Sequence, residues 1–125
     1  MGNVKKKTIL IVDDEEGLVD LLTDIFDAEG FEVLTASHGK EALGILAQGE
    51  RVDLILSDVR MPFCGGVEFL TKLRAGGSKV PLVFMSEFTD LSESEARDLG
   101  ASALVSKPLN TEYVVSLVKK DLHIT

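Results

Sequence analysis

Residues 8–14 read Thr-Ile-Leu-Ile-Val-Asp-Asp, and this stretch decides the fold. Every residue of Thr8–Val12 is apolar or β-branched, so the segment predicts a strand that needs no polar face. Such a strand is buried on both sides, which is typical of a parallel sheet covered by helices. Two carboxylates, Asp13 and Asp14, follow at the point where this strand ends.

Four further apolar runs predict the remaining strands of the sheet. They are Phe31–Ala36, Asp53–Ser57, Pro81–Met85 and Ser102–Ser106. Phe31–Ala36 alternates between apolar and polar residues, as a less buried strand would, and Ser102–Ser106 is the weakest of the four.

Between these runs the apolar residues recur at helical spacing. Leu18, Leu21, Leu22 and Ile25 lie at i, i+3, i+4 and i+7, which is one face of a helix. Similar spacing predicts three more helices, around residues 42–46, 67–73 and 114–118.

Two helix ends carry capping signals. Ser92 and Glu95 have the spacing of a capping box, so a helix is expected from there until Gly100 ends it. Asn110 is the expected N-cap of the last helix. Five strands then alternate with five helices, which predicts a doubly wound five-stranded parallel α/β sheet.

Length and composition narrow the class of protein. The 125 residues fit one domain, 1–125, with a core from about residue 8 to 122. A formal net charge of -8 argues against direct binding to nucleic acid. Cys64, the only cysteine, allows no internal disulfide, and the first apolar run is too short for a leader or a membrane span. We therefore expect a cytoplasmic protein.

Polar residues end the predicted strands, and in an open parallel sheet ligands bind beyond those ends. They are Asp13, Asp14, Asp58, Ser86 and Lys107. Taken singly, each has a plain explanation, as a helix-start acid, a loop acid, a turn hydroxyl or a surface lysine. Together they predict one site, because the pair Asp13-Asp14 and each of the other three residues end a different strand at the same edge.

Such a cluster needs a cation, because crowded carboxylates repel one another and a single ammonium does not balance three. An all-oxygen site with open positions suits Mg²⁺. With a hydroxyl and an ammonium opposite, the arrangement can hold a phosphoryl group, and Asp58 is the natural nucleophile to form an acyl phosphate.

These blocks resemble the signature of response regulator receiver domains of two-component signalling systems. The matching residues are Asp13-Asp14, Asp58-x-x-Met61-Pro62, Gly66, Ser86 and Lys107-Pro108. The resemblance extends from Thr8 to about Leu122. It implies a chemotaxis-regulator-like, flavodoxin-like (βα)5 fold with strand order 2-1-3-4-5.

The resemblance also implies roles for the site residues. Asp58 is then the phosphoacceptor, and Asp14, Asp58 and the backbone carbonyl of Arg60 ligate Mg²⁺. Asp13 acts mainly through a metal-bound water.

Lys107 pairs with the phosphoryl oxygens, and Ser86 hydrogen-bonds the phosphoryl group and carries the conformational signal. The Lys107–Pro108 peptide bond is expected to be cis.

The implied protein is a signalling phosphoacceptor rather than an enzyme, although it supports its own phosphoryl transfer and dephosphorylation. Its expected donor is a sensor histidine kinase or a phosphotransfer protein. Its expected target is an output domain or a partner protein, bound by the surface of the fourth helix, fifth strand and fifth helix. The resemblance also allows a homodimer, and no membrane partner is expected.

Three features depart from the family pattern. Leu104 stands where an aromatic residue often moves with the switch hydroxyl, and Glu87 stands where a small residue usually keeps the site open. Arg60 and Phe88 flank the site, and we expect their bulk to restrict the hydrolytic water and to lengthen the acyl-phosphate lifetime.

Two alternatives belong to other classes of protein. A phosphatase of the haloacid dehalogenase type would carry a second aspartate two residues after the nucleophile, where this chain has Arg60. A binding module that has lost phosphorylation is favoured only by Glu87 and Leu104. The complete set of acids, hydroxyl and lysine argues against it.

Overall fold

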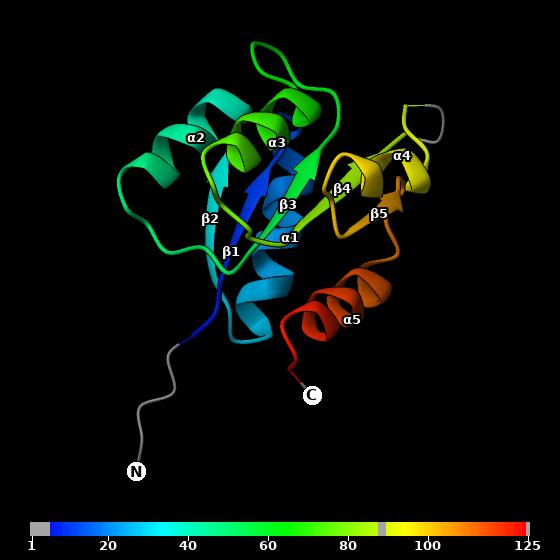
Figure 1. The fold of residues 1–125 in the computed structure, drawn as a ribbon. Helices are drawn as coiled ribbons and strands as arrows, with labels where there is room; N and C mark the ends of the chain where they lie inside the picture. The colour runs from blue at the N-terminus through cyan, green and yellow to red at the C-terminus, as the bar shows by residue number, and fades with distance from the viewer. Residues whose placement is uncertain (1–5, 88–89, 125) are drawn as a thin grey trace.

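The computed structural model describes residues 6–87 and 90–124, and within them five parallel strands form one sheet in the order β2-β1-β3-β4-β5 (Figure 1). The strands are β1 (Thr8–Val12), β2 (Glu32–Ala36), β3 (Leu54–Asp58), β4 (Leu82–Ser86) and β5 (Ala103–Ser106). Strand β1 has the expected bounds, and each of the other four strands differs from its expected range by one residue at one or both ends. The expected alternation and strand order are confirmed.

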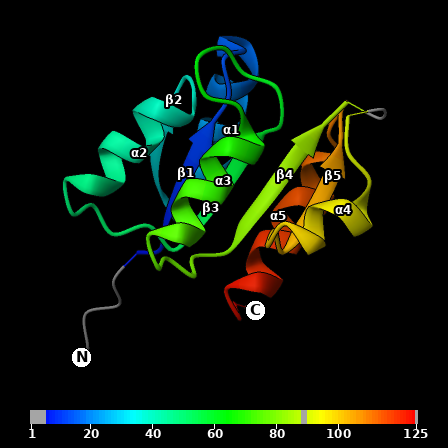
Figure 2. The same cartoon turned by 45° about the horizontal axis from the view of Figure 1, so that its top comes forward.

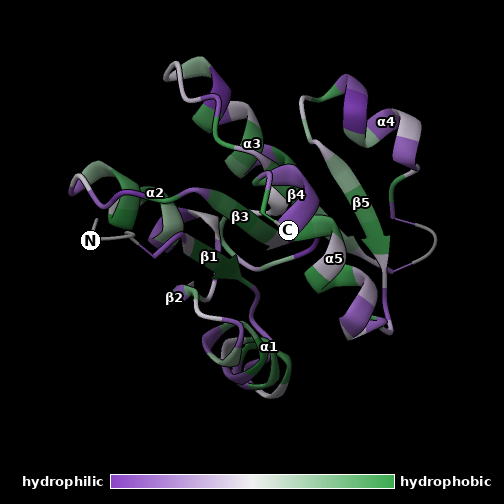
Figure 3. Cartoon of the chain, turned by 90° about the horizontal axis from the view of Figure 1, so that it is seen from below, coloured by the Kyte–Doolittle hydropathy of each residue, from purple (hydrophilic) through white to green (hydrophobic). Residues whose placement is uncertain are grey.

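Five helices connect the strands. They are α1 (Glu16–Ala28), α2 (Gly39–Ala47), α3 (Gly66–Ala75), α4 (Glu93–Asp98) and α5 (Thr111–Asp121). Helices α1 and α5 cover one face of the sheet, while α2, α3 and α4 lie on the other (Figures 2 and 3). The domain is therefore doubly wound, as the alternating sequence predicts.

Strand β1 illustrates how the two cores form. Ile9 and Ile11 pack with α1 and α5, whereas Leu10 and Val12 pack with α2 and α3. All four side chains are fully buried. Because successive side chains point to opposite faces, a strand between two helix layers must be apolar at every position.

The predicted helix ends are confirmed. Ser92 accepts a hydrogen bond from the Glu95 amide, and the Glu95 carboxylate accepts one from the Ser92 amide, which completes a capping box. Gly100 has a φ of 104°, which favours glycine just beyond a helix. Asn110 caps α5 by accepting from the Tyr113 amide. No helix in the described ranges is both long and apolar enough to cross a membrane.

Candidate functional site

Three carboxylates meet at the carboxyl edge of the sheet. Val12 and Ser57 are register partners in the paired strands β1 and β3, so the residues that follow them emerge side by side. One oxygen from each of Asp13, Asp14 and Asp58 lies within 4.8 Å of the others. Asp13 and Asp58 are buried, whereas Asp14 is exposed. The sequence prediction that these acids form one cluster is confirmed.

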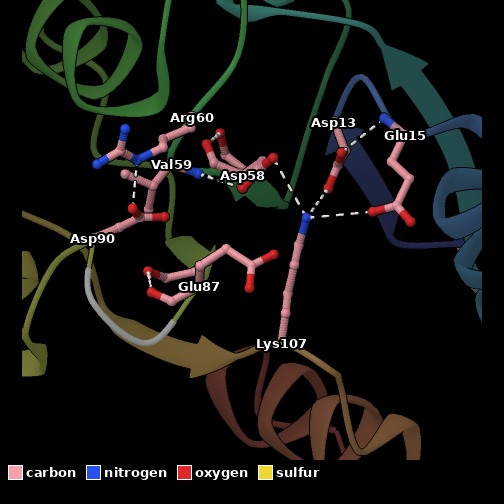
Figure 4. A network of polar contacts seen from close by, with 10 residues as sticks. Asp13, Glu15, Asp58, Val59, Arg60, Glu87, Asp90 and Lys107 are labelled. Atoms are coloured by element: carbon pink, nitrogen blue, oxygen red, sulfur yellow. Dashed lines mark hydrogen bonds and ion pairs between the residues drawn. The ribbon is translucent and has the colours of Figure 1, made fainter.

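Lys107 reaches this cluster from the end of β5. Its Nζ donates to Asp13 Oδ2 at 3.0 Å and lies 3.4 Å from Asp58 Oδ2 (Figure 4). A third carboxylate, Glu15, has Oε1 at 3.8 Å from the same nitrogen. Burial disfavours the ammonium, but the hydrogen bond and charge of Asp13, with the charge of Asp58, outweigh it and raise the pKa of Lys107.

The charge of Asp58 is incompletely balanced. Burial first, and then the neighbouring charge of Asp13, raise the pKa of Asp58 from 3.8 to about 6. The charge of Lys107 and the hydrogen bond from the Val59 amide, at 2.8 Å, act in the opposite direction and are outweighed. A further cation beside the three aspartates would stabilise their ionised forms.

Ser86 ends β4 and is buried, as expected of a site residue. Its Oγ donates to the backbone carbonyl of Glu87 at 2.7 Å. The same carbonyl accepts the Asp90 amide at 3.1 Å. The hydroxyl is therefore engaged by the loop between β4 and α4 in this conformation.

The two loops that flank the site are joined by an ion pair. Arg60, two residues after Asp58, donates from Nε to Asp90 Oδ1. The Asp90 side chain is only 5% exposed, and its Oδ2 has no hydrogen-bond partner among the described residues. Phe88, the second residue expected to flank the site, lies outside the described residues.

Glu15 and Asp90 are site residues that the sequence reasoning missed. Glu15 directly follows the two aspartates, so its position beside the predicted cluster was a usable signal. Asp90 carries no such signal, because its contact joins two loops and follows no strand or helix period.

The structure also places three features that lie outside the acidic cluster. The Lys107–Pro108 bond is cis, as expected. His38 lies two residues after β2, and its Nδ1 accepts from the Glu41 amide at 3.2 Å, so it acts as the N-cap of α2. Cys64, in the loop before α3, is buried and contributes to the core.

A sequence model of the response regulator receiver domain matches residues 9–119. Sporulation initiation phosphotransferase F of Bacillus subtilis (strain 168) is 34% identical over 115 residues, which are 91% of this chain and 92% of that protein. The alkaline phosphatase synthesis transcriptional regulatory protein PhoP of the same strain is 36% identical over 114 residues. That match covers 90% of this chain but 47% of PhoP, so the chain spans about half the length of that relative.

Solved structures agree with the sequence comparison. A CheY-like response regulator receiver domain protein from Methanospirillum hungatei is 29% identical, with a TM-score of 0.87 over 95% of both chains. Response regulator protein TrrA from Thermotoga maritima, solved in complex with Mg(2+)-BeF, is 30% identical, with a TM-score of 0.82 over 93% of this chain and 99% of TrrA. The chain therefore belongs to the family of response regulator receiver domains of two-component systems.

Proposed function

We propose that the single domain of residues 1–125, with its core at about 8–122, accepts a phosphoryl group on Asp58. The donor is a histidine kinase or a phosphotransfer protein in the cytoplasm. One observation carries the proposal: the Lys107 ammonium lies 3.0 Å from Asp13 and 3.4 Å from Asp58, in the same cluster as Asp14. Three acids and an amine in one cluster suit an anion held together with a divalent metal.

The donor set fits Mg²⁺, because hard oxygen ligands from three carboxylates converge and one of them, Asp14, is exposed to solvent. Asp14, Asp58 and the backbone carbonyl of Arg60 would hold the ion, and Asp13 would act through a water. When bound, Mg²⁺ supplies positive charge to the phosphoryl oxygens. The relative TrrA was solved with Mg(2+)-BeF, which supports the assignment.

In the transfer step, a carboxylate oxygen of Asp58 forms a bond to phosphorus as the bond from phosphorus to the donor nitrogen breaks. The electron pair stays on the imidazole of the donor histidine, and Asp58 becomes an acyl phosphate. Lys107 then pairs with a phosphoryl oxygen.

Switching follows from a change of partner for Ser86. Its hydroxyl now donates to the Glu87 carbonyl, and a phosphoryl oxygen on Asp58 is a stronger, charged acceptor. Losing that bond frees the loop between β4 and α4. The signal then passes to the surface of α4, β5 and α5, where an output domain, a partner protein or a second copy would bind. Leu104 lacks the ring that usually reports this movement, so the loop must carry more of the signal.

The decisive experiment measures Mg²⁺-dependent modification of Asp58. We expect beryllofluoride to shift the NMR resonances of residues around Asp58 only when Mg²⁺ is present. Phosphoramidate should add one phosphoryl group by mass, and Asp58→Asn should abolish both effects. Retention of the mass gain in Asp58→Asn would refute the assignment of the phosphoacceptor.

The same measurement tests the second candidate, a binding module without phosphorylation. Glu87 and Leu104 favour that candidate, because both depart from the family pattern. It would show neither a beryllofluoride response nor a mass gain while remaining folded by circular dichroism.

A further inference from the structure

Glu87 places an additional carboxylate at the mouth of the site. It directly follows Ser86, is exposed, and lines a groove together with Glu15, Lys107 and Pro108. Figure 4 shows its carboxylate pointing toward the space between Asp58 and Lys107. The described partners of the Lys107 ammonium are Asp13, Glu15 and Asp58, so the ammonium is already shared when Glu87 approaches it.

The positive charges nearby do not compensate this surplus. Three carboxylates lie within 3.8 Å of the ammonium, a fourth belongs to the same acidic cluster, and Glu87 lines the adjoining groove. Five carboxylates and one ammonium leave four formal negative charges, and a divalent cation would still leave two. The five are Asp13, Asp14, Glu15, Asp58 and Glu87. Among the described residues that flank the site, Arg60 carries a further positive charge, and that charge is paired with Asp90.

Building on the proposed function, we propose that Glu87 is a specificity-determining residue for the phosphodonor. Its charge repels free, highly charged small phosphodonors and thereby favours a phosphohistidine carried by a protein. A small dianion meets the full negative potential of the site, because nothing on the donor screens it. A protein donor can place its own cations against Glu15 and Glu87 as it docks, which converts the same charges into attraction.

Two small phosphodonors that differ in net charge but give the same product can reveal the effect of the charge of Glu87. Acetyl phosphate is largely a dianion at neutral pH. Asp58 attacks its phosphorus, the bond from phosphorus to the acetate oxygen breaks, and acetate leaves with the electron pair. Phosphoramidate reacts as a monoanion whose nitrogen is already protonated, so ammonia leaves with the electron pair of the broken bond. Both reactions give the same acyl phosphate on Asp58.

The test compares labelling rates of Glu87→Gln and Glu87→Ala with those of the natural chain at low ionic strength and saturating Mg²⁺. Coulomb energy scales with donor charge, so we expect removal of Glu87 to raise the acetyl phosphate rate roughly tenfold and the phosphoramidate rate roughly threefold. Added salt should shrink both gains. Glu50→Gln, an equal change at an exposed position between α2 and β3, should leave both rates unchanged.

Each other outcome overturns the proposal. If only Glu87→Ala accelerates labelling, bulk rather than charge restricts the donor. If both donors accelerate equally, or if Glu50→Gln accelerates labelling as well, the effect is not local discrimination by charge. Failure of the proposed function looks different, because no variant would then respond to beryllofluoride with Mg²⁺, although all would melt as folded proteins.

Discussion

Asp58 carries a charge that its immediate surroundings do not balance, and this has a consequence for stability. The carboxyl titrates near 3.8 when the chain is unfolded and at about 6 when it is folded. The folded state therefore prefers the protonated acid. The penalty for ionisation is absent below about pH 4, grows between pH 4 and 6, and is complete above pH 6.

We predict that Asp58→Asn stabilises the metal-free protein at pH 7.5. The full shift corresponds to about 3 kcal/mol, and solvent screening at this partly accessible site reduces the expected gain to about 1–2 kcal/mol. Thermal unfolding at pH 7.5 and at pH 4 measures it. The gain should disappear at pH 4, and an equal gain at both values would contradict the electrostatic origin.

Phe63 is a second residue whose conformation has a measurable effect. Its φ is 66°, in the left-handed region, and the residue is 86% exposed. Its ring makes an edge-on contact with the His38 ring, with the ring centroids 5.1 Å apart. Bulky residues are strained in this region, whereas asparagine tolerates it.

We therefore predict that Phe63→Asn raises the free energy of unfolding by about 0.5–1 kcal/mol. Chemical denaturation measures the change. Tyr113→Asn is the matched control, because Tyr113 is also an exposed aromatic but lies in helix α5. A gain in both variants would point to exposed aromatic surface rather than to backbone strain.

Sequence reasoning finds site residues when they end apolar runs. Asp13, Asp58, Ser86 and Lys107 were found in this way, because a polar residue after a buried strand is conspicuous. Contacts made by long side chains across loops are harder to predict from the sequence. The contact of Glu15 with Lys107 and the pairing of Arg60 with Asp90 depend on rotamers and loop paths, which have no period in the sequence.

At the scale of elements, the loop after β3 and the loop after β4 are tied together by Arg60 and Asp90. The Asp90 amide and the Ser86 hydroxyl both donate to the Glu87 carbonyl, so the connection continues to Ser86. This connection holds the Arg60 side chain against the loop after β4, and we expect the joined loops to restrict the access of water to Asp58.

We predict that Arg60→Ala and Asp90→Asn both accelerate loss of the phosphoryl group from Asp58. The expected factor is roughly two- to fivefold, because an exposed ion pair contributes about 0.5–1 kcal/mol. Timed loss of the label after removal of the donor measures the rate.

Phe88→Ala is also expected to accelerate loss of the phosphoryl group, and the argument for it rests on the bulk of the side chain alone. Unchanged lifetimes in the Arg60 and Asp90 variants would refute the role of the tie.

Helix α3 begins against the backbone of β3, and Gly66 makes this possible. A Cβ at that position would collide with the Asp58 carbonyl oxygen and would lie 2.9 Å from Cε1 of Phe84. Gly44, inside α2, has nothing within 4 Å of the equivalent point. Of these two glycines, packing therefore requires the one at Gly66 and leaves room for a side chain at Gly44.

We predict that Gly66→Ala destabilises the domain by about 1–3 kcal/mol, because neither the backbone nor the buried ring can move away easily. Gly44→Ala should instead stabilise it by about 0.5–1 kcal/mol through helix propensity. Denaturant midpoints of the two variants provide the measurement. Equal effects of the two substitutions would show that the close approach at Gly66 is relieved at little cost.

Element types were predictable from the sequence, whereas four of the five strands differ from the expected bounds by one residue at one or both ends. The runs that begin at Asp53 and Pro81 were expected to be strands, yet β3 and β4 begin one residue later and end at Asp58 and Ser86. Apolarity reports burial, whereas a strand is defined by backbone pairing. Asp53 and Pro81 each make one backbone hydrogen bond to the neighbouring strand, from the Asp53 amide to the Thr8 carbonyl and from the Ile55 amide to the Pro81 carbonyl. The regular strand pairing begins at the residue after each of them.

For the whole molecule, binding of Mg²⁺ should raise the free energy of unfolding. We predict that Mg²⁺ at about a hundred times its dissociation constant adds about 2.7 kcal/mol by mass action. Asp14→Asn should abolish this gain because it removes one proposed ligand. Melting with and without Mg²⁺ measures the effect, and Glu50→Gln should keep it. A gain that survives in Asp14→Asn would contradict the metal assignment.

The order of the strands in the sheet could not be predicted from the local sequence pattern alone. Alternation of strands and helices predicts a parallel sheet, but many orders satisfy that rule, and the order 2-1-3-4-5 came from the resemblance to receiver domains. Which strands are neighbours depends on long-range packing, which a single sequence does not reveal.

The ion pair between Asp13 and Lys107 joins residues 94 positions apart. During synthesis a chain leaves the ribosome from its N-terminus, so all three aspartates emerge while Lys107 is still inside the exit tunnel. A nascent chain therefore exposes its acids for many seconds without the amine that opposes them. The cluster proposed to hold a phosphoryl group therefore forms only after β5 and the lysine that follows it have been synthesised.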